Sequence, residues 1–80
     1  MLLCRVTGCV VSTRKHDKLK GNRFLILETL TKPTTRLVAV DQLGAGIGEK
    51  VLVATGGAAR IATSEDTPVC AAVVGIVDEE

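Results

Sequence analysis

Hydrophobic residues along the chain fall into short runs, and several of these runs have the two-residue period of a β-strand. In the first run, Cys4, Val6 and Val10 alternate with Arg5 and Thr7, which is the pattern of a half-buried strand. Four further aliphatic runs follow. The pattern predicts five strands, at residues 2–13, 23–30, 36–40, 50–55 and 70–77.

The second of these strands is apolar on both faces. Phe24, Ile26 and Leu30 lie on one side, and Leu25 and Leu27 lie on the other. In a small barrel the inner face fills the core, so a second apolar face would be an exposed patch of a kind that monomers rarely carry. We therefore expect the outer wall of the barrel to meet another subunit.

Turn-forming residues separate the predicted strands, and a single segment, residues 56–62, has the character of a helix of one or two turns. Five strands and one short helix in 80 residues predict a single all-β domain over residues 1–80, a small five-stranded OB-like Greek-key β-barrel. The usual OB helix falls between strands three and four, whereas here the helical segment falls between strands four and five. The turn residues are Gly21, Asn22, Pro33, Asp41 with the glycines after it, Thr67 and Pro68.

The composition also points to an oligomer. The chain is 46% hydrophobic with one Phe and no Trp or Tyr, so its core is aliphatic. A chain this short buries only about 60% of its extended surface on folding and is marginal alone. Net charge is +1, but residues 1–36 hold eight Lys/Arg and two Asp/Glu (+6), and residues 37–80 hold two and seven (−5). The two halves can pair between copies or within one subunit.

The cysteines predict neither a disulfide framework nor a metal site. Cys4, Cys9 and Cys70 are odd in number and form no C-x-x-C motif. Each lies in an apolar run, so we expect all three to be buried and inert. The first residues are interrupted too soon by Arg5 for a signal peptide, and no run approaches the roughly 20 apolar residues of a membrane span. We expect a soluble, cytoplasmic protein.

The glycine-rich segment at 44–48 invites comparison with a nucleotide-binding loop. Its glycines, Gly44, Gly46 and Gly48, fail the G-x-G-x-x-G spacing, and a strand follows them where that motif needs a helix. The helix N-terminus that would bind a pyrophosphate is therefore missing. We interpret the three glycines as the backbone of a tight loop between strands three and four.

Three segments that together cover most of the chain carry recognisable motifs, VTGCVVSTRKHDKLKGNRFLIL at 6–27, VDQLGAGIGEKVLVATGGAAR at 40–60 and TPVCAAVVGIVDE at 67–79. The most specific are the D-x-x-G-A-G-x-G-E element beginning at Asp41 and the closing G-I-V-D beginning at Gly75. In these segments the chain resembles the EutN/CcmL family, the pentameric vertex proteins of bacterial microcompartment shells. Gly57 and Ala58 stand where the family often has two serines, so a polar lining there is lost.

The resemblance implies a structural role without a cofactor or metal. It implies a homopentamer of OB-like barrels that caps the vertices of a microcompartment shell in the cytoplasm, with hexameric shell proteins as neighbours and no membrane or nucleic acid as partner. The small residues Gly56, Gly57 and Ala58 are candidates for the five-fold axis or a narrow pore. Asp41 and Asp78 have two possible roles, capping turns or forming a salt bridge between subunits with Arg60. The interface candidates are Arg14, Lys15, Lys18, Asp41, Glu49, Arg60 and Asp78.

Two other functions fit the sequence less well. The single histidine, His16, lies among basic residues and has no nucleophile or catalytic partner, so we expect no enzyme. An OB-like barrel can also bind single-stranded nucleic acid, and the basic segment 14–23 could contact phosphates. Such binding uses aromatic side chains for base stacking, but Phe24 is the only aromatic residue and lies in a predicted core strand.

Overall fold

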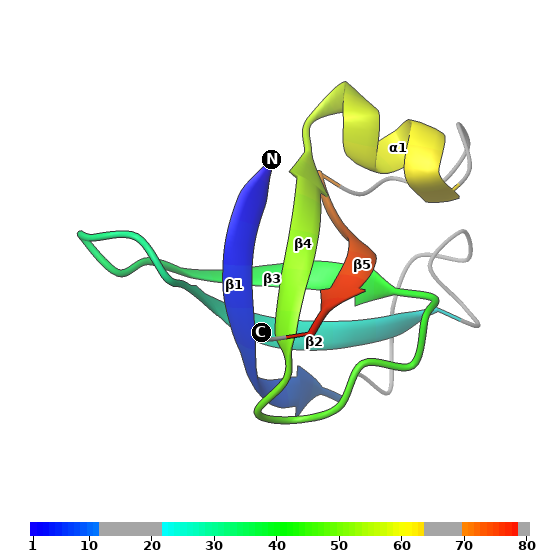
Figure 1. Cartoon of the computed structure of the whole chain (residues 1–80). Helices are drawn as coiled ribbons and strands as arrows, with labels where there is room; N and C mark the ends of the chain where they lie inside the picture. The colour runs from blue at the N-terminus through cyan, green and yellow to red at the C-terminus, as the bar shows by residue number, and fades with distance from the viewer. Residues whose placement is uncertain (12–21, 64–69, 79–80) are drawn as a thin grey trace.

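The computed structural model describes residues 1–11, 22–63 and 70–78 and contains five strands and one short helix in that part of the chain. The strands close into a barrel in the order β1-β2-β3-β5-β4, which returns to β1 (Figure 1). The fold class and the position of the helix between strands four and five are therefore as predicted. The elements are β1 (Leu2–Val10), β2 (Arg23–Thr29), β3 (Arg36–Asp41), β4 (Lys50–Thr55), α1 (Gly57–Thr63) and β5 (Ala71–Val77).

Strand pairing is antiparallel throughout the barrel except between β3 and β5, which run parallel. The connection between these parallel strands contains β4 and α1, because parallel neighbours cannot be joined by a tight turn. Closure matters for a chain this small, since a closed barrel leaves no unpaired strand edge. The outer wall is then the part of the sheet that remains available to other molecules.

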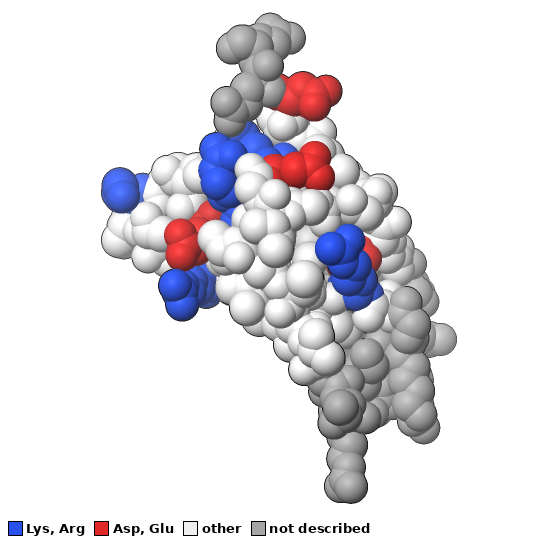
Figure 2. All heavy atoms as spheres, turned by 90° about the horizontal axis from the view of Figure 1, so that it is seen from below, with Lys and Arg blue, Asp and Glu red and all other residues white. Residues whose placement is uncertain are grey.

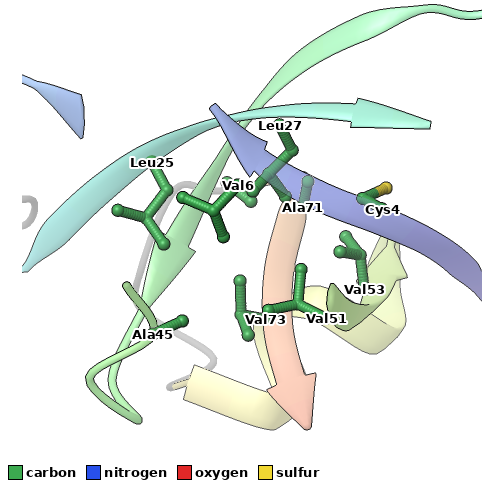
Figure 3. Packing of buried hydrophobic residues seen from close by; sticks show 10 residues of the cluster. Cys4, Val6, Leu25, Leu27, Ala45, Val51, Val53, Ala71 and Val73 are labelled. Carbon is green, nitrogen blue, oxygen red and sulfur yellow. The ribbon is translucent and has the colours of Figure 1, made fainter. Parts of the chain in front are cut away.

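The core consists of aliphatic side chains that point into the barrel from all five strands (Figure 3). Leu25 and Leu27 of β2 are fully buried, so the inner face of β2 is the Leu25–Leu27 side predicted from the sequence. Ala45, from the β3–β4 loop, is also fully buried and belongs to the same cluster. The buried members of this cluster are Cys4, Val6, Leu25, Leu27, Ala39, Ala45, Val51, Val53, Ala71 and Val73.

A β-bulge in β1 corrects one sequence prediction. Val6 pairs with Leu27, but the next pair is Gly8 with Ile26, so Thr7 is an extra residue. A bulge shifts the alternation of side chains by one position. Val10 therefore does not share the inner face of Cys4 and Val6; it pairs with Phe24 on the outer wall and is exposed.

The helix α1 covers part of the outer wall. Ala59 of α1 packs with Val40 of β3 and Ala72 of β5 in a second buried cluster, and Phe24 packs against its edge. Phe24 is thus partly buried beneath the helix rather than displayed for stacking. Figure 1 shows α1 at one end of the barrel and the β3–β4 loop at the other.

The predicted burial of the cysteines holds for one residue of the three. Cys4 is buried on the inner face of β1, whereas Cys9 and Cys70 are exposed. Cys9 follows the bulge near the end of β1, and Cys70 precedes β5. Both lie at strand ends, where an apolar neighbourhood in the sequence does not ensure burial in the barrel.

Candidate functional site

The loop between β3 and β4 is organised by the carboxylate of Asp41. Its Oδ1 accepts a hydrogen bond from the Leu43 backbone N–H at 2.9 Å, and its Oδ2 accepts one from the Ala45 N–H at 2.8 Å. Arg23 lies 3.7 Å from the same carboxylate, whose side chain has no exposed surface. Asp41 therefore fills the turn-capping role, the first of the two roles considered for it.

Two of the three glycines in this loop are favoured by their backbone conformation, and the third by the space around it. Gly44 and Gly48 adopt φ values of 84° and 90°, a conformation that side chains disfavour. Gly46 does not, but its N–H donates to Glu49 Oε1 at 2.6 Å, and a Cβ there would lie 3.3 Å from that oxygen. The tight loop expected between strands three and four is therefore present.

Several backbone N–H groups of the loop donate to acceptors within the subunit. Those of Leu43, Ala45 and Gly46 bind carboxylates of the chain itself, and that of Gly48 donates to the Val6 carbonyl at 2.8 Å. A phosphate-binding loop needs such groups to point at its ligand. This segment is instead a rigid loop that presents Leu43 and Ile47 to solvent, where they are 52% and 68% exposed.

At the opposite end of the barrel, the start of α1 brings together the three candidates for the five-fold axis. Gly56 has a φ of 63° and begins the turn into the helix, with its N–H bonded to the Cys70 carbonyl at 2.8 Å. Gly57 and Ala58 form the first turn of α1, and all three residues are exposed. The structure thus groups them in one small, solvent-facing segment.

The outer wall carries apolar side chains in two areas divided by charges. One area contains Val10, Ile26 and Val38, on β1, β2 and β3; the other contains Leu3 and Leu52, on β1 and β4. Between them runs a row of paired positions across four strands, and its Arg36 and Glu28 form an ion pair at 3.2 Å. The row consists of Arg36, Glu28, Arg5 and Lys50.

The charged interface candidates are divided between described and undescribed parts of the chain. Glu49 and Asp78 line one shallow depression of about 250 Å³, together with Arg5 and Lys50. Figure 2 shows this end of the molecule, where positive and negative side chains lie close together between broad uncharged areas. The Arg60 backbone belongs to α1, but its side chain is not described, and Arg14, Lys15 and Lys18 lie outside the described residues.

The described residues provide little for chemistry. In residues 1–11, 22–63 and 70–78, His, Cys, Asp and Glu form no group of three or more that could hold a metal ion. Burial raises the pKa of the Cys4 thiol, which makes it a poorer nucleophile. No helix in the same ranges is long and apolar enough to cross a membrane. His16 lies outside them.

Most apolar residues of the outer wall were not predicted individually from the sequence. The clearest signal for an apolar outer wall was Ile26, which faces away from Leu25 and Leu27 in a strand that is apolar throughout. Leu3, Val38 and Leu52 gave a weaker signal, since their outward direction depends on the register of the barrel. Leu43 and Ile47 gave no signal, because they lie in a loop, where the alternation of apolar and polar residues does not predict which side chains are exposed.

Comparison with known proteins covers nearly the whole chain. Residues 1–78 match the family described as ethanolamine utilisation protein EutN/carboxysome. The bacterial microcompartment shell vertex protein GrpN of Rhodospirillum rubrum is 46% identical over 98% of this chain and 93% of its own length. The carboxysome shell vertex protein CcmL of Thermosynechococcus vestitus is 47% identical over 98% of this chain and 84% of its own.

Solved structures agree with these relatives. An ethanolamine utilization protein EutN superimposes with a TM-score of 0.92 at 41% identity, covering 100% of this chain and 88% of that one. GrpN from Rhodospirillum rubrum, described as a pentameric microcompartment shell protein, superimposes with a TM-score of 0.85 at 41% identity, covering 99% and 95%. With the closed barrel, the capped glycine loop and the apolar outer wall, these likenesses show that the chain belongs to the EutN/CcmL family.

Proposed function

We propose that this protein is a structural shell protein that forms a homopentamer and caps the vertices of a bacterial microcompartment in the cytoplasm. The observation that carries the proposal is the likeness, over nearly the full chain, to proteins described as microcompartment and carboxysome shell vertex proteins. The apolar outer wall also supports the proposal, because monomers rarely expose a large apolar patch and another subunit would cover it.

The proposed role is geometric and involves no reaction. A layer of six-fold units is flat, and five-fold units introduce the curvature that closes it into a shell. We expect hexameric shell proteins to surround each pentamer. The charged candidates at its periphery are the basic segment with Arg14, Lys15 and Lys18, and the described acids Glu49 and Asp78. Arg60 stays a candidate, whereas the Asp41 side chain has no exposed surface and is left out of the interface we propose.

The start of α1 is the proposed lining of the five-fold axis. Gly57 has neither a positive φ nor any atom within 4 Å of the position a Cβ would occupy. Alanine is a better helix former than glycine, by about 1 kcal/mol in a helix interior and by less at the first position of α1, so the subunit alone gives no reason for glycine. Close approach of neighbouring copies at the five-fold axis is a reason for glycine at this position. Gly57→Leu is then expected to hinder ring closure, and an unchanged oligomer in that variant would count against this placement.

The decisive experiment is the mass of the protein in solution, measured by light scattering on a sizing column. One chain has a mass of 8.4 kDa, and the proposed ring has five times that mass. A measured mass near five chains supports the proposal and makes hexameric shell proteins the next partners to test. A folded monomer at all workable concentrations would overturn it. Binding of single-stranded nucleic acid would then be tested next.

A further inference from the structure

Two glycines lie inside strands on the outer wall, and the space around them does not require glycine. Gly8 in β1 pairs with Ile26, and Gly75 in β5 pairs with Leu52. A methyl group on Gly8 would lie 3.7 Å from Ile26 Cδ1, and one on Gly75 would lie 3.7 Å from Leu52 Cβ. Both distances are ordinary van der Waals contacts. Alanine would therefore fit at both positions within the subunit.

Backbone conformation does not require these glycines either. Each lies next to a bulge: Thr7 is the extra residue beside Gly8, and Val74 is the extra residue beside Gly75. The type of bulge that needs glycine places it in the left-handed conformation, and neither Gly8 nor Gly75 has a positive φ. Glycine inside a strand weakens it and often marks a bulge or the close approach of another backbone, and the φ angles show that these two bulges do not require glycine. The reason for these two glycines is therefore to be sought outside the subunit.

Each glycine lies beside apolar side chains of the outer wall. We call Gly8 with Val10, Ile26 and Val38 the Gly8 face; Val10 and Val38 are 38% and 50% exposed. Gly8 has no side chain above its backbone, and Cδ1 of Ile26, its paired residue, lies beside it.

The corresponding surface around the other glycine, the Gly75 face, consists of Gly75, Leu52 and Leu3, which are paired positions across β5, β4 and β1. Leu3 is 44% exposed. The row of Arg36, Glu28, Arg5 and Lys50 passes between the two faces on β1, the one strand that both include, where Arg5 lies between Leu3 and Gly8.

The two faces are centred on different strands of the barrel, although β1 contributes to both. The Gly8 face is centred on β2, and the Gly75 face lies over β4 and β5. In the closed order β1-β2-β3-β5-β4, β1 separates β2 from β4, and β3 separates β2 from β5. Figure 1 shows the same arrangement, with β4 and β5 passing in front of β2 and β3. A subunit of a closed cyclic ring needs two different surfaces of this kind, one for each neighbour.

We propose that the Gly8 face of one subunit packs against the Gly75 face of the next copy, each glycine admitting an apolar side chain of its neighbour. This inference rests on the proposed pentamer and assigns its contact surfaces. A second copy is the occupant that fits, because pentameric relatives align with nearly all of this chain and a ring of identical subunits uses two unlike surfaces in equal number. The charged row then forms a polar rim to each apolar contact.

The test uses paired variants of the full chain. Gly8→Ala and Gly75→Ala fit within the subunit, so far-UV circular dichroism is expected to stay unchanged while the concentration at which the ring half-dissociates rises at least about tenfold. Gly8→Leu and Gly75→Leu are expected to leave less than about a tenth of the protein in the five-chain species. Thr34→Leu adds similar bulk at an exposed loop position away from both faces and is expected to assemble normally.

Mixing the two leucine variants tests the pairing itself. Each retains one intact face, so together they should form a one-to-one dimer, with twice the mass of one chain, that neither forms alone. A dimer formed by either variant alone, or no dimer in the mixture, would overturn the head-to-tail pairing. Alanine variants with unchanged ring stability would overturn the inference even if the leucine variants failed to fold. In these cases the unchanged chain is still a pentamer and the proposed function stands, whereas a monomeric unchanged chain removes both.

Discussion

The hydrogen bonds of Asp41 predict that Asp41→Asn destabilises the fold although it barely changes the size of the side chain. The two carboxylate oxygens accept from two different backbone N–H groups, those of Leu43 and Ala45. An asparagine has one acceptor oxygen, so in either orientation of the amide one N–H faces an NH₂ group. That N–H is left without a partner in a site where the Asp41 side chain is fully buried.

The magnitude follows from three contributions. Loss of one hydrogen bond to a charged group, with its donor left unsatisfied, costs about 1.5–3 kcal/mol. The ion pair with Arg23, at 3.7 Å and with the arginine 47% exposed, contributes about 0–1 kcal/mol. A neutral amide is easier to bury than a carboxylate, which offsets part of this loss. We expect the free energy of unfolding to fall by about 2 kcal/mol.

Urea denaturation followed by circular dichroism measures this change. All proteins are compared at one protomer concentration, because self-association stabilises the folded state by mass action. Glu28→Gln is the control, since it breaks the ion pair with Arg36 at 3.2 Å without leaving a buried N–H unpaired, and we expect a change within about 0.5 kcal/mol. A change as small as the control's in Asp41→Asn would refute the view that the carboxylate holds the loop.

Three other substitutions give separable results. Leu27→Ala removes a fully buried side chain and is expected to lower the free energy of unfolding by about 2–5 kcal/mol in the same urea assay; a loss below about 1 kcal/mol would contradict this packing. Gly44→Ala has room for its methyl group but requires φ near 84°, so about 1–2 kcal/mol should be lost, and an equally stable variant would mean that the loop can relax. Burial raises the pKa of the Cys4 thiol above its ordinary 9.0. Stability should therefore be unaffected by this group well below pH 9.0 and fall as the pH rises through 9.0, because the thiol of the unfolded chain ionises first. In urea denaturation, Cys4→Ala should lose less free energy of unfolding between about pH 8 and about pH 10 than the unchanged chain, and an equal loss would contradict this reasoning.

The sequence was sufficient to place the described elements to within one residue at each end, except that β1 ends at Val10 whereas the prediction extended the strand to residue 13. Alternation and turn residues define a strand well when it is short and aliphatic. Alternation failed where the backbone departs from regularity, as at Thr7, whose bulge reverses the direction of Val10. A bulge of this type leaves no clear trace in the order of apolar and polar residues. It becomes visible only in the register between strands.

The candidate site was predictable to a lesser degree. Turn capping was one of two roles that the sequence left open for Asp41, and its hydrogen bonds to Leu43 and Ala45 correspond to that role. The exposure of Cys9 and Cys70 was not predictable, because burial at a strand end depends on where the barrel closes. The role proposed for Gly8 and Gly75 was not predictable from the sequence for a related reason. Whether the subunit itself requires a glycine in a strand can be judged only when its φ angle and its surroundings are known.

The outer wall also links folding to assembly, which gives a final prediction. The single subunit leaves Leu3, Val10 and Val38 exposed, and a folded chain of 80 residues is only marginally stable by itself. If a neighbouring copy covers these side chains, folding and ring formation share the same apolar burial. The midpoint of thermal unfolding should then rise with protein concentration, since the folded ring is favoured over free chains by mass action. Calorimetry over a hundredfold range of concentration measures this. A midpoint that does not move, in a sample that light scattering shows to be a ring of five chains, would mean that the barrel reaches its full stability before its outer wall is covered.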